Sequence, residues 1–233
     1  MSNVKAAAVL VCAGSGSRMQ GSCADKLLLE IAEKPVAVHT LCAYDQVDEI
    51  DFIVVVTREE NVSVYQSFAA QYGIQTPVLV TVGGKTRIDS VLNGVRAVPA
   101  EYELVAIADG ARPLVRVEDI SKTIEAAAEY GAAALGVTAI DTMKEVKDGR
   151  IVRTVPREQL IQIQTPQVFR LDEYLELAVK AQKSEKEFTD DASIYEFYDK
   201  PVRFVEGHRD NLKITVPEDA KMIKNLMEER LCE

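Results

Sequence analysis

Short, continuous apolar runs recur along the first half of the chain, and stretches with helical spacing of apolar positions separate them. Runs of this kind, bounded by glycine or polar residues, are typical of strands buried on both faces of a parallel sheet. The predicted strands are 6–11, 52–57, 78–82, 104–108 and 133–137, and the predicted helices are 35–44, 61–72, 88–95 and 117–130. The alternation predicts an α/β fold, a three-layer α/β/α sandwich around a mostly parallel, Rossmann-like sheet.

The pattern changes after these elements. Residues 143–155 form two β-prone runs on either side of Asp148-Gly149, a dipeptide that favours a tight hairpin turn. We therefore predict a β-hairpin arm at about 141–157 that projects from the sheet. A helix over 171–182, strands over 202–205 and 212–216 and a helix from Pro217 are expected after it. No repeat or linker interrupts the pattern, so we expect a single domain over 1–233.

Composition narrows the class of partner. The 233 residues carry a formal net charge of −10, which argues against general affinity for nucleic acid or an anionic membrane. The four cysteines have no metal-binding or CxxC spacing, and free thiols suit a reducing compartment. The apolar run at 6–13 is too short to span a membrane. We expect a cytoplasmic protein with neither nucleic acid nor membrane as a partner.

A loop with two glycines follows the first predicted strand. It reads Ala13-Gly14-Ser15-Gly16-Ser17-Arg18-Met19, and Lys26 comes soon after it. Glycines let backbone N–H groups approach an anion closely. The loop matches neither the dinucleotide fingerprint nor the P-loop, but backbone donors followed by two cations suit a triphosphate. The alternative is a tight turn beside two solvated cations.

A carboxylate ends the fourth predicted strand, where ligands bind in parallel sheets. A lone carboxylate such as Asp109 can hold Mg²⁺ when phosphates supply the remaining ligands, and Arg112 can fork onto a phosphate. Alternatively, Asp109 caps the turn at Gly110, or the two side chains pair with each other. His39 and His208 lack catalytic or metal spacing, so we expect structural or surface roles for them.

Four further segments complete a family pattern. They are 83–91 (GGKTRIDSV), 108–113 (ADGARP), 164–167 (QTPQ) and 210–215 (DNLKIT). In this order, with the glycine loop and Lys26, they resemble the 2-C-methyl-D-erythritol 4-phosphate cytidylyltransferases of isoprenoid precursor synthesis. The resemblance runs from the first strand to about Asp219, and DTMK at 141–144 and TDDAS at 189–193 agree with it. The chain departs from the family at Ala108 and Gly110, where His and Ala are usual, and at Lys26, which stands in DKL instead of PKQ.

The resemblance implies transfer of CMP from CTP to 2-C-methyl-D-erythritol 4-phosphate, with pyrophosphate leaving and Mg²⁺ as cofactor. Both reacting groups are anions, so positioning and charge neutralisation must carry catalysis. The catalytic residues expected are Arg18 and Lys26. The CTP-binding residues expected are Ala13, Gly14, Ser15, Gly16, Gly83, Gly84, Ser90 and Gly110. The substrate-binding residues expected are Asp109, Arg112, Thr142, Arg157, Thr189 and Lys213, with Asp109 also holding the metal.

Two of these assignments have simpler alternatives, because Ser90 can bond its own helix backbone and Arg157 can be solvated. Ribitol 5-phosphate or a sugar acid as substrate, and a non-catalytic nucleotide-binding protein, also stay open.

The predicted arm bears on assembly. A two-stranded ribbon is marginal alone, and this one carries the apolar residues Val146, Ile151, Val152 and Val155. A symmetric homodimer would cover it, and the resemblance implies the same arrangement. We expect Thr142 and Arg157 to serve the partner's site.

Overall fold

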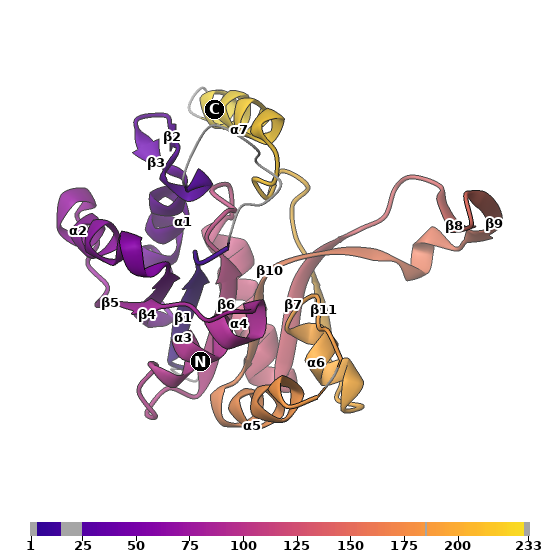
Figure 1. The fold of residues 1–233 in the computed structure, drawn as a ribbon, viewed down its shortest axis with the longest axis horizontal. Helices are drawn as coiled ribbons and strands as arrows, with labels where there is room; N and C mark the ends of the chain where they lie inside the picture. Colours follow the sequence, from indigo (N-terminus) through magenta and orange to yellow (C-terminus); the bar gives the residue numbers. More distant parts are fainter. Residues whose placement is uncertain (1–3, 15–24, 185, 231–233) are drawn as a thin grey trace.

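The computed structural model describes residues 4–14, 25–184 and 186–230, and a seven-stranded sheet forms its centre (Figure 1). The strands are β1 (Ala6–Val11), β4 (Ile50–Thr57), β5 (Val78–Val82), β6 (Leu104–Asp109), β7 (Ala132–Thr138), β10 (Ile161–Arg170) and β11 (Arg203–Glu206). Their order across the sheet is β11-β7-β10-β6-β1-β4-β5. β1 pairs in parallel with β4 on one side and β6 on the other, which explains its uninterrupted apolar run.

Strand β10 is the one antiparallel member of this sheet, between β6 and β7. We did not predict it, because its sequence IQIQTPQVFR contains a proline and three glutamines. Proline is normally excluded from central strands. Here the register with β7 is interrupted between Ile163 and Gln167, so Pro166 lies where the ladder is already broken. The sheet is therefore mostly parallel, as predicted, with one reversed strand.

Helices cover both faces of the sheet. They are α1 (Val36–Asp45), α2 (Val62–Tyr72), α3 (Arg87–Arg96), α4 (Val117–Tyr130), α5 (Leu171–Gln182), α6 (Ala192–Phe197) and α7 (Pro217–Arg230). Buried residues of α1, α2, α4 and α7 share one apolar core with one side of β1. Buried residues of α3, α5 and α6 share the other core with the opposite side of β1. The predicted three-layer sandwich is confirmed.

Small elements connect these layers. They are the 3-10 helices η1 (Lys26–Leu28), η2 (Glu59–Asn61) and η3 (Arg157–Gln159), and a two-stranded ribbon of β2 (Glu30–Ile31) and β3 (Lys34–Pro35). The strand predicted over 212–216 is wrong, because these residues form no strand. The Ile214 N–H bonds Ala111 O, while the N–H groups of Thr215 and Val216 bond the Asp219 carboxylate. Their backbone groups are thus used by a loop and by the start of α7.

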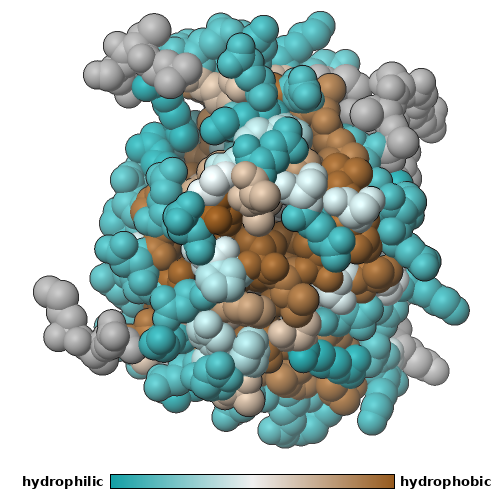
Figure 2. Space-filling view, turned by 90° about the vertical axis from the view of Figure 1, so that its left-hand side faces the viewer, coloured by the Kyte–Doolittle hydropathy of each residue, from teal (hydrophilic) through white to brown (hydrophobic). Residues whose placement is uncertain are grey.

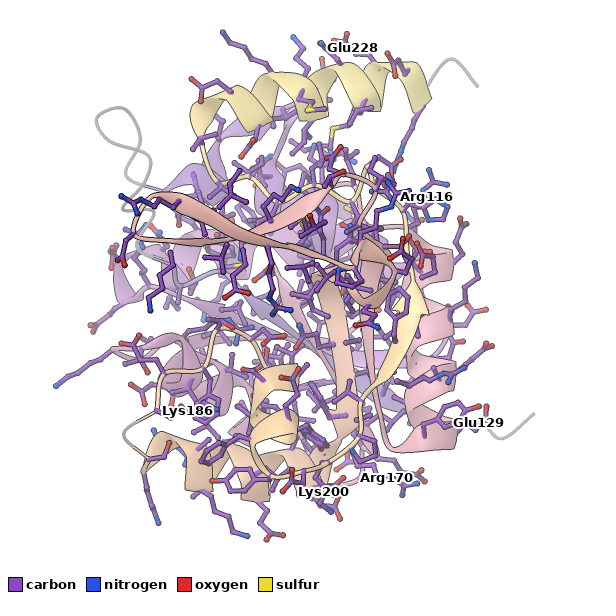
Figure 3. The ribbon with its side chains drawn as sticks, turned by 90° about the vertical axis from the view of Figure 1, so that its right-hand side faces the viewer. Arg116, Glu129, Arg170, Lys186, Lys200 and Glu228 are labelled. Carbon is purple, nitrogen blue, oxygen red and sulfur yellow. The ribbon has the colours of Figure 1, made fainter. Side chains whose placement is uncertain are left out.

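The predicted hairpin arm is confirmed as β8 (Met143–Lys147) paired with β9 (Arg150–Val155). Its turn has positive φ at Asp148 (50°) and Gly149 (74°), as a tight hairpin turn requires. Figure 1 shows the arm projecting far from the sheet, and Figure 3 shows it crossing in front of the body when viewed from its own side. Val146, Ile151 and Val152 are 59%, 68% and 55% exposed, so the described part of the chain leaves these apolar side chains largely uncovered.

The opposite side of the molecule ends at the edge strand β5. Figure 2 shows this side, where apolar surface gathers in the middle and polar surface borders it. The large apolar residues exposed on α2 and β5 are Val64, Leu79 and Val82. Among the described residues, no helix is both long and apolar enough to cross a membrane.

Candidate active site

The parallel strands β1, β4, β5 and β6 end at the same edge of the sheet. Backbone hydrogen bonds join the residue that follows one strand to the end of the neighbouring strand. Cys12 N donates to Val56 O at 2.7 Å, and Gly83 N donates to Thr57 O at 2.8 Å. Gly110 N donates to Val11 O at 3.1 Å. The predicted phosphate loop, the glycine pair and the Asp109 segment therefore lie at one edge, where ligands bind in this fold.

The glycine pair lies tightly against its neighbours. A Cβ added to Gly83 would lie 2.4 Å from the Cβ of Ala13, and one added to Gly84 would lie 2.2 Å from the Cβ of Asp89. Both positions therefore require glycine, and Gly83 contacts the start of the phosphate loop. The Ser90 hydroxyl accepts a hydrogen bond from Gly84 N at 3.0 Å. It also lies 3.0 Å from Thr86 O, as a donor within its own helix turn, which is the simpler of its two predicted roles.

Asp109 is the centre of a charged cluster. Its Oδ2 lies 2.9 Å from Lys213 Nζ and 3.4 Å from Arg112 Nε. Burial alone would raise the pKa of Asp109, but Lys213, Arg112 and Arg87 together hold the pKa below its usual value. The carboxylate is therefore charged at neutral pH, as a metal ligand must be. The ion pair between Arg112 and Asp109, which the sequence left as an alternative, is present.

Lys26 reaches the same cluster from the other side. Its Nζ donates to Ile214 O at 2.7 Å, one residue from Lys213. Arg112 binds the same segment, with Nη1 donating to Asn211 O at 2.7 Å. The structure thus brings Asp109, Arg112 and Lys213 into one charged cluster and places Lys26 against the residue next to Lys213.

Other predicted residues lie apart from the cluster or outside the described residues. Ser15, Gly16 and Arg18 fall in 15–24, which is not described. Thr142 and Arg157 lie at the exposed base of the arm, where Arg157 donates to Ile140 O, and neither bonds the cluster.

Thr189 is exposed and lines a separate pocket. The pocket has a volume of about 460 Å³ and also includes Arg87 and Asp89.

Asp109 offers a plausible metal ligand. Its Oδ2 is paired, whereas no hydrogen bond or ion pair within the described residues involves its Oδ1. One free carboxylate oxygen fits Mg²⁺, which takes one or two carboxylates and completes its shell with phosphates and water. A second group able to hold a metal lies elsewhere, where Glu118, Asp119 and His208 place ligand atoms within 4.8 Å of one another. His208 Nδ1 and Asp119 Oδ2 are 2.8 Å apart, an ion pair if the histidine is protonated.

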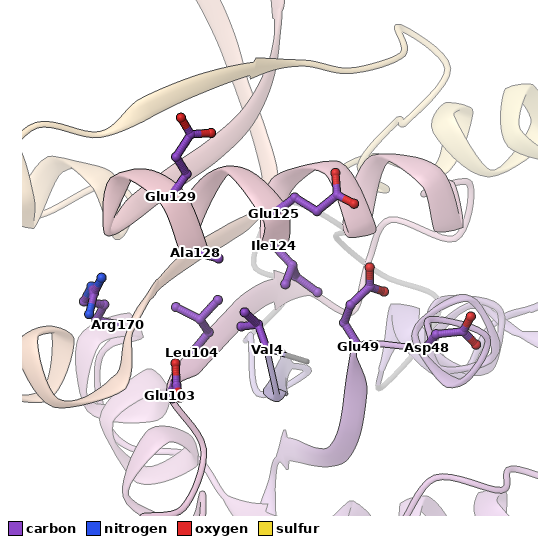
Figure 4. A pocket seen from close by; sticks show the side chains of 10 residues that line it. All are labelled: Val4, Asp48, Glu49, Glu103, Leu104, Ile124, Glu125, Ala128, Glu129 and Arg170. Carbon is purple, nitrogen blue, oxygen red and sulfur yellow. The ribbon is translucent and has the colours of Figure 1, made fainter. Parts of the chain in front are cut away.

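Another pocket lies away from this edge. It has a volume of about 610 Å³ and lies at the amino ends of the strands, near Val4 and Leu104 (Figure 4). Its charged lining consists of Asp48, Glu49, Glu103, Glu125, Glu129 and Arg170. Five carboxylates against one arginine would repel a triphosphate, so the charged cluster at the carboxyl ends is the better candidate site.

Known proteins match the chain over almost its whole length. The family model of 2-C-methyl-D-erythritol 4-phosphate cytidylyltransferase matches residues 6–229. The chain belongs to this family. A cytidylyltransferase of this name from Clostridium botulinum (strain Langeland) is 39% identical over 225 residues, covering 96% of this chain and 98% of that protein. One from Desulforamulus reducens is 38% identical over 227 residues and covers 97% of each chain.

Solved structures agree with the family assignment. The 4-diphosphocytidyl-2C-methyl-D-erythritol synthase from Anaerococcus prevotii superposes with a TM-score of 0.87 at 30% identity, covering 97% of both chains. The 2-C-methyl-D-erythritol 4-phosphate cytidylyltransferase from Thermus thermophilus gives a TM-score of 0.75 at 27% identity, covering 94% of this chain and 98% of that one. The resemblance and the fold class predicted from sequence are confirmed.

Several supports of this cytidylyltransferase site were missed from sequence. Thr165 Oγ1 accepts from Asp109 N at 3.1 Å, and Thr40 Oγ1 donates to Gly110 O at 3.1 Å. Arg87 pairs with the buried Asp191 carboxylate at 2.5 Å, and Tyr174 donates to the same carboxylate at 2.6 Å. Arg87, Thr165 and Asp191 stand inside the family motifs, which was the available signal. Thr40 lies outside them, in α1, and only the fold brings it to the site.

Proposed function

We propose that this chain transfers CMP from CTP to 2-C-methyl-D-erythritol 4-phosphate, forming 4-diphosphocytidyl-2-C-methyl-D-erythritol and pyrophosphate. The observation that carries the proposal is the pairing of Arg112 and Lys213 with Asp109, beside the bond from Lys26 to Ile214, at the carboxyl edge of the sheet in a member of this family. Three cations and one carboxylate suit two phosphate-bearing substrates and a metal ion. We place the reaction in the cytoplasm, in one catalytic unit.

The chemistry is a displacement at phosphorus. An oxygen of the sugar phosphate attacks the α-phosphorus of CTP, a new P–O bond forms, and the bond to the β-phosphate oxygen breaks. The bonding electrons leave with pyrophosphate, so no covalent enzyme intermediate is required. Negative charge rises on the α-phosphate oxygens and on the leaving group, and fixed cations stabilise it.

The residues divide this work by position. Lys26 shares the cluster with Lys213 and neutralises the α-phosphate, together with Arg18. Lys213 and Arg112 hold the attacking phosphate, and the pairs that they make with Asp109 exchange for phosphate oxygens. The backbone of Ala13, Gly14, Gly83, Gly84 and Gly110 lines the nucleotide side, with Ser90 beside it. Thr189 lines the pocket next to the glycine pair, together with Arg87 and Asp89, and we assign it to substrate binding.

Mg²⁺ is the metal that we assign to this site. Asp109 would contribute one carboxylate oxygen, and phosphate oxygens of CTP and water would supply the remaining ligands. When bound, the ion neutralises phosphate charge and orients the triphosphate. The Glu118, Asp119 and His208 group is less suited to it, because imidazole is a ligand that zinc and other transition metals prefer.

We also propose that the enzyme is a homodimer joined through the arm. The described residues of the chain do not cover the exposed apolar side chains of β8 and β9, and a self-complementary interface would cover them. Arg157 and Thr142 lie at the base of the arm and do not bond their own chain's charged cluster. They would then complete the sugar-phosphate site of the partner subunit.

A pyrophosphate-release assay tests the function. The purified protein is given CTP and Mg²⁺ with either 2-C-methyl-D-erythritol 4-phosphate, ribitol 5-phosphate or a sugar acid, and the product is identified by its mass. We expect turnover with the methylerythritol phosphate and at least about tenfold lower kcat/KM with the others, the scale of losing one good site contact. Preference for ribitol 5-phosphate would reassign the substrate, and no turnover with any acceptor would refute the function.

A further inference from the structure

The segment between β4 and α2, residues 58–61, bonds both flanks of the phosphate-loop region. Arg58 Nη2 lies 3.4 Å from Gly14 O, and Asn61 Nδ2 donates to Asp25 Oδ2 at 2.8 Å. Gly14 and Asp25 are the described residues on either side of 15–24. The Asn61 bond is much the shorter of the two, so it is the contact that can fix a position.

Asp25 is buried, with 3% of its surface exposed, and uses both carboxylate oxygens. Oδ1 accepts from Leu27 N at 3.0 Å, while Oδ2 accepts from Asn61. Burial raises the pKa of Asp25, and the bond from Leu27, the charge of Arg58 and the bond from Asn61 act against that rise. The carboxylate therefore ties the backbone around Lys26 to the start of α2.

The side chain of Asn61 makes this contact and does not cap its own helix. It stands at the N-cap of α2, where asparagine normally accepts a hydrogen bond from the first helical turn. Its side chain makes no such cap bond. The amide is directed to Asp25 instead.

The backbone at Asp25 differs from what a proline would impose. In the family, lysine usually follows proline, whose ring holds φ near about −65°. Asp25 has φ −145°, which a proline ring does not allow. In this chain, therefore, hydrogen bonds to the Asp25 carboxylate constrain the backbone before Lys26, where a proline ring would do so in the family.

Lys26 needs such a constraint. Its ammonium sits at the end of a flexible four-carbon stem, so its reach depends on where its backbone is held. That ammonium contacts Ile214 O at 2.7 Å, beside the charged cluster. A small displacement of a catalytic group can cost orders of magnitude in rate.

We propose that Asn61 is a positioning residue: it holds the Asp25 carboxylate, which fixes the backbone on both sides of Lys26 so that the ammonium reaches the transferring phosphate. The inference rests on the proposed function, and specifically on the role of Lys26. It extends the site to Asn61, a residue outside the family motifs.

The test is a reciprocal exchange of the pair. Asn61→Asp sets two carboxylates against each other, whereas Asp25→Asn/Asn61→Asp restores an amide–carboxylate pair of reversed polarity and keeps an acceptor for Leu27 N. We expect Asn61→Asp to lower kcat by at least about tenfold with little change in the KM for CTP, the signature of a misplaced catalytic group. The double variant should recover kcat to within about threefold of the wild type, less than half a decade. Asn225→Asp, which adds the same charge on the exposed side of α7, is the matched control and should change neither constant.

Two further measurements separate the possible failures. In a Lys26→Ala background, Asn61→Asp should lower kcat no further, because the pair acts through that lysine. Hydrogen exchange of residues 25–29 should quicken in Asn61→Asp and slow again in the double variant, whether or not the enzyme turns over. If Asn61→Asp does not fold, Asn61→Ala replaces it, since it removes the bond without adding a charge.

The outcomes are distinguishable. If the wild type forms no product, the proposed function fails, and hydrogen exchange alone decides whether the pair holds this backbone. An unchanged kcat and unchanged exchange in Asn61→Asp would overturn the inference. So would a loss of kcat that the double variant does not recover, or one that persists in full without Lys26.

Discussion

Replacing Gly110 with alanine should destabilise the protein, because the new Cβ would lie 2.3 Å from the Sγ of Cys12. Cys12 is 1% exposed, and the bond from Gly110 N to Val11 O joins the ends of the two strands. Ordinary carbon contacts lie at about 3.5–4.0 Å, so an atom must move by about 1 Å or more. Overpacking a core by one methyl costs about 1–3 kcal/mol, and the rigid surroundings put this case near the upper value.

Adding the Cys12→Ala substitution should reverse the loss of stability. Cys12→Ala removes the sulfur that the alanine methyl meets, so we expect Cys12→Ala/Gly110→Ala to be more stable than Gly110→Ala by about 1–2 kcal/mol. Cys12→Ala alone leaves a small void and should cost about 1 kcal/mol. Urea unfolding followed by circular dichroism gives the four free energies of the cycle.

A matched control is available at Gly14, where an added Cβ meets no atom of the described residues within 4 Å. Gly14→Ala should therefore change stability little. The steric argument is wrong if Gly110→Ala is as stable as the wild type, or if the two substitutions are simply additive. If the cycle behaves as expected, it explains why this chain has glycine where alanine is usual in the family: Cys12 occupies the space.

Three further predictions concern the reaction. CTP should be turned over far better than ATP or GTP, because the tight packing of Gly83 against Ala13 limits how far this segment can move to accept a larger base; comparable turnover of a purine triphosphate would contradict this. Asp109→Asn should raise the Mg²⁺ concentration for half-maximal activity by at least about tenfold, the scale for disturbing a metal ligand, and an unchanged titration would leave Asp109 only its ion pairs. Arg157→Ala and Lys26→Ala chains should each be inactive alone, and co-refolding them at equal ratio, with subunit exchange confirmed, should restore about a quarter of wild-type activity. About half the dimers are then mixed, and each mixed dimer has one intact site of two. A mixture as inactive as its components would place Arg157 in its own chain's site.

The elements predicted best were those whose sequence pattern has a single physical cause. β1 and β5 have the predicted bounds, and so do α4 and α5. β1 is covered by helices on both faces and needs apolar residues at every position, and glycine ends a helix where the backbone turns left-handed. Gly73, with φ 69° at the end of α2, illustrates the second case.

The failures arose where tertiary contacts override local pattern. The first three residues of β10 are exposed and only its second part is buried, so it lacks a continuous apolar run. Residues 212–216 are β-prone, yet their N–H groups bond Ala111 O and the Asp219 carboxylate instead of a neighbouring strand. Ala111 is too distant in sequence to be read as a pattern, whereas Asp219 follows Val216 by three residues and marks the start of α7, a local signal that the β-prone residues masked.

The site residues show the same contrast between local sequence pattern and tertiary contacts. Sequence placed Lys26, Asp109, Arg112 and Lys213 at one edge, because strand ends and family motifs point there. It left open whether Arg112 pairs with Asp109, and the structure shows that it does, at 3.4 Å. The support that Thr40 gives to Gly110 could not be foreseen, because it depends on how α1 packs against the sheet.

The kinetics of Lys26→Ala test most directly whether the cations at the strand ends stabilise the transferring phosphate. Formation of the cytidylyl product is followed at saturating Mg²⁺ for the wild type, Lys26→Ala and the control Lys5→Ala, whose lysine pairs with Asp51 at 3.0 Å at the far end of the sheet. We predict that Lys26→Ala lowers kcat by at least about a hundredfold while the KM for CTP changes little, as for loss of a transition-state donor. Lys5→Ala should match the wild type. An intact kcat with a raised KM would mean that Lys26 only binds substrate, and would contradict the account.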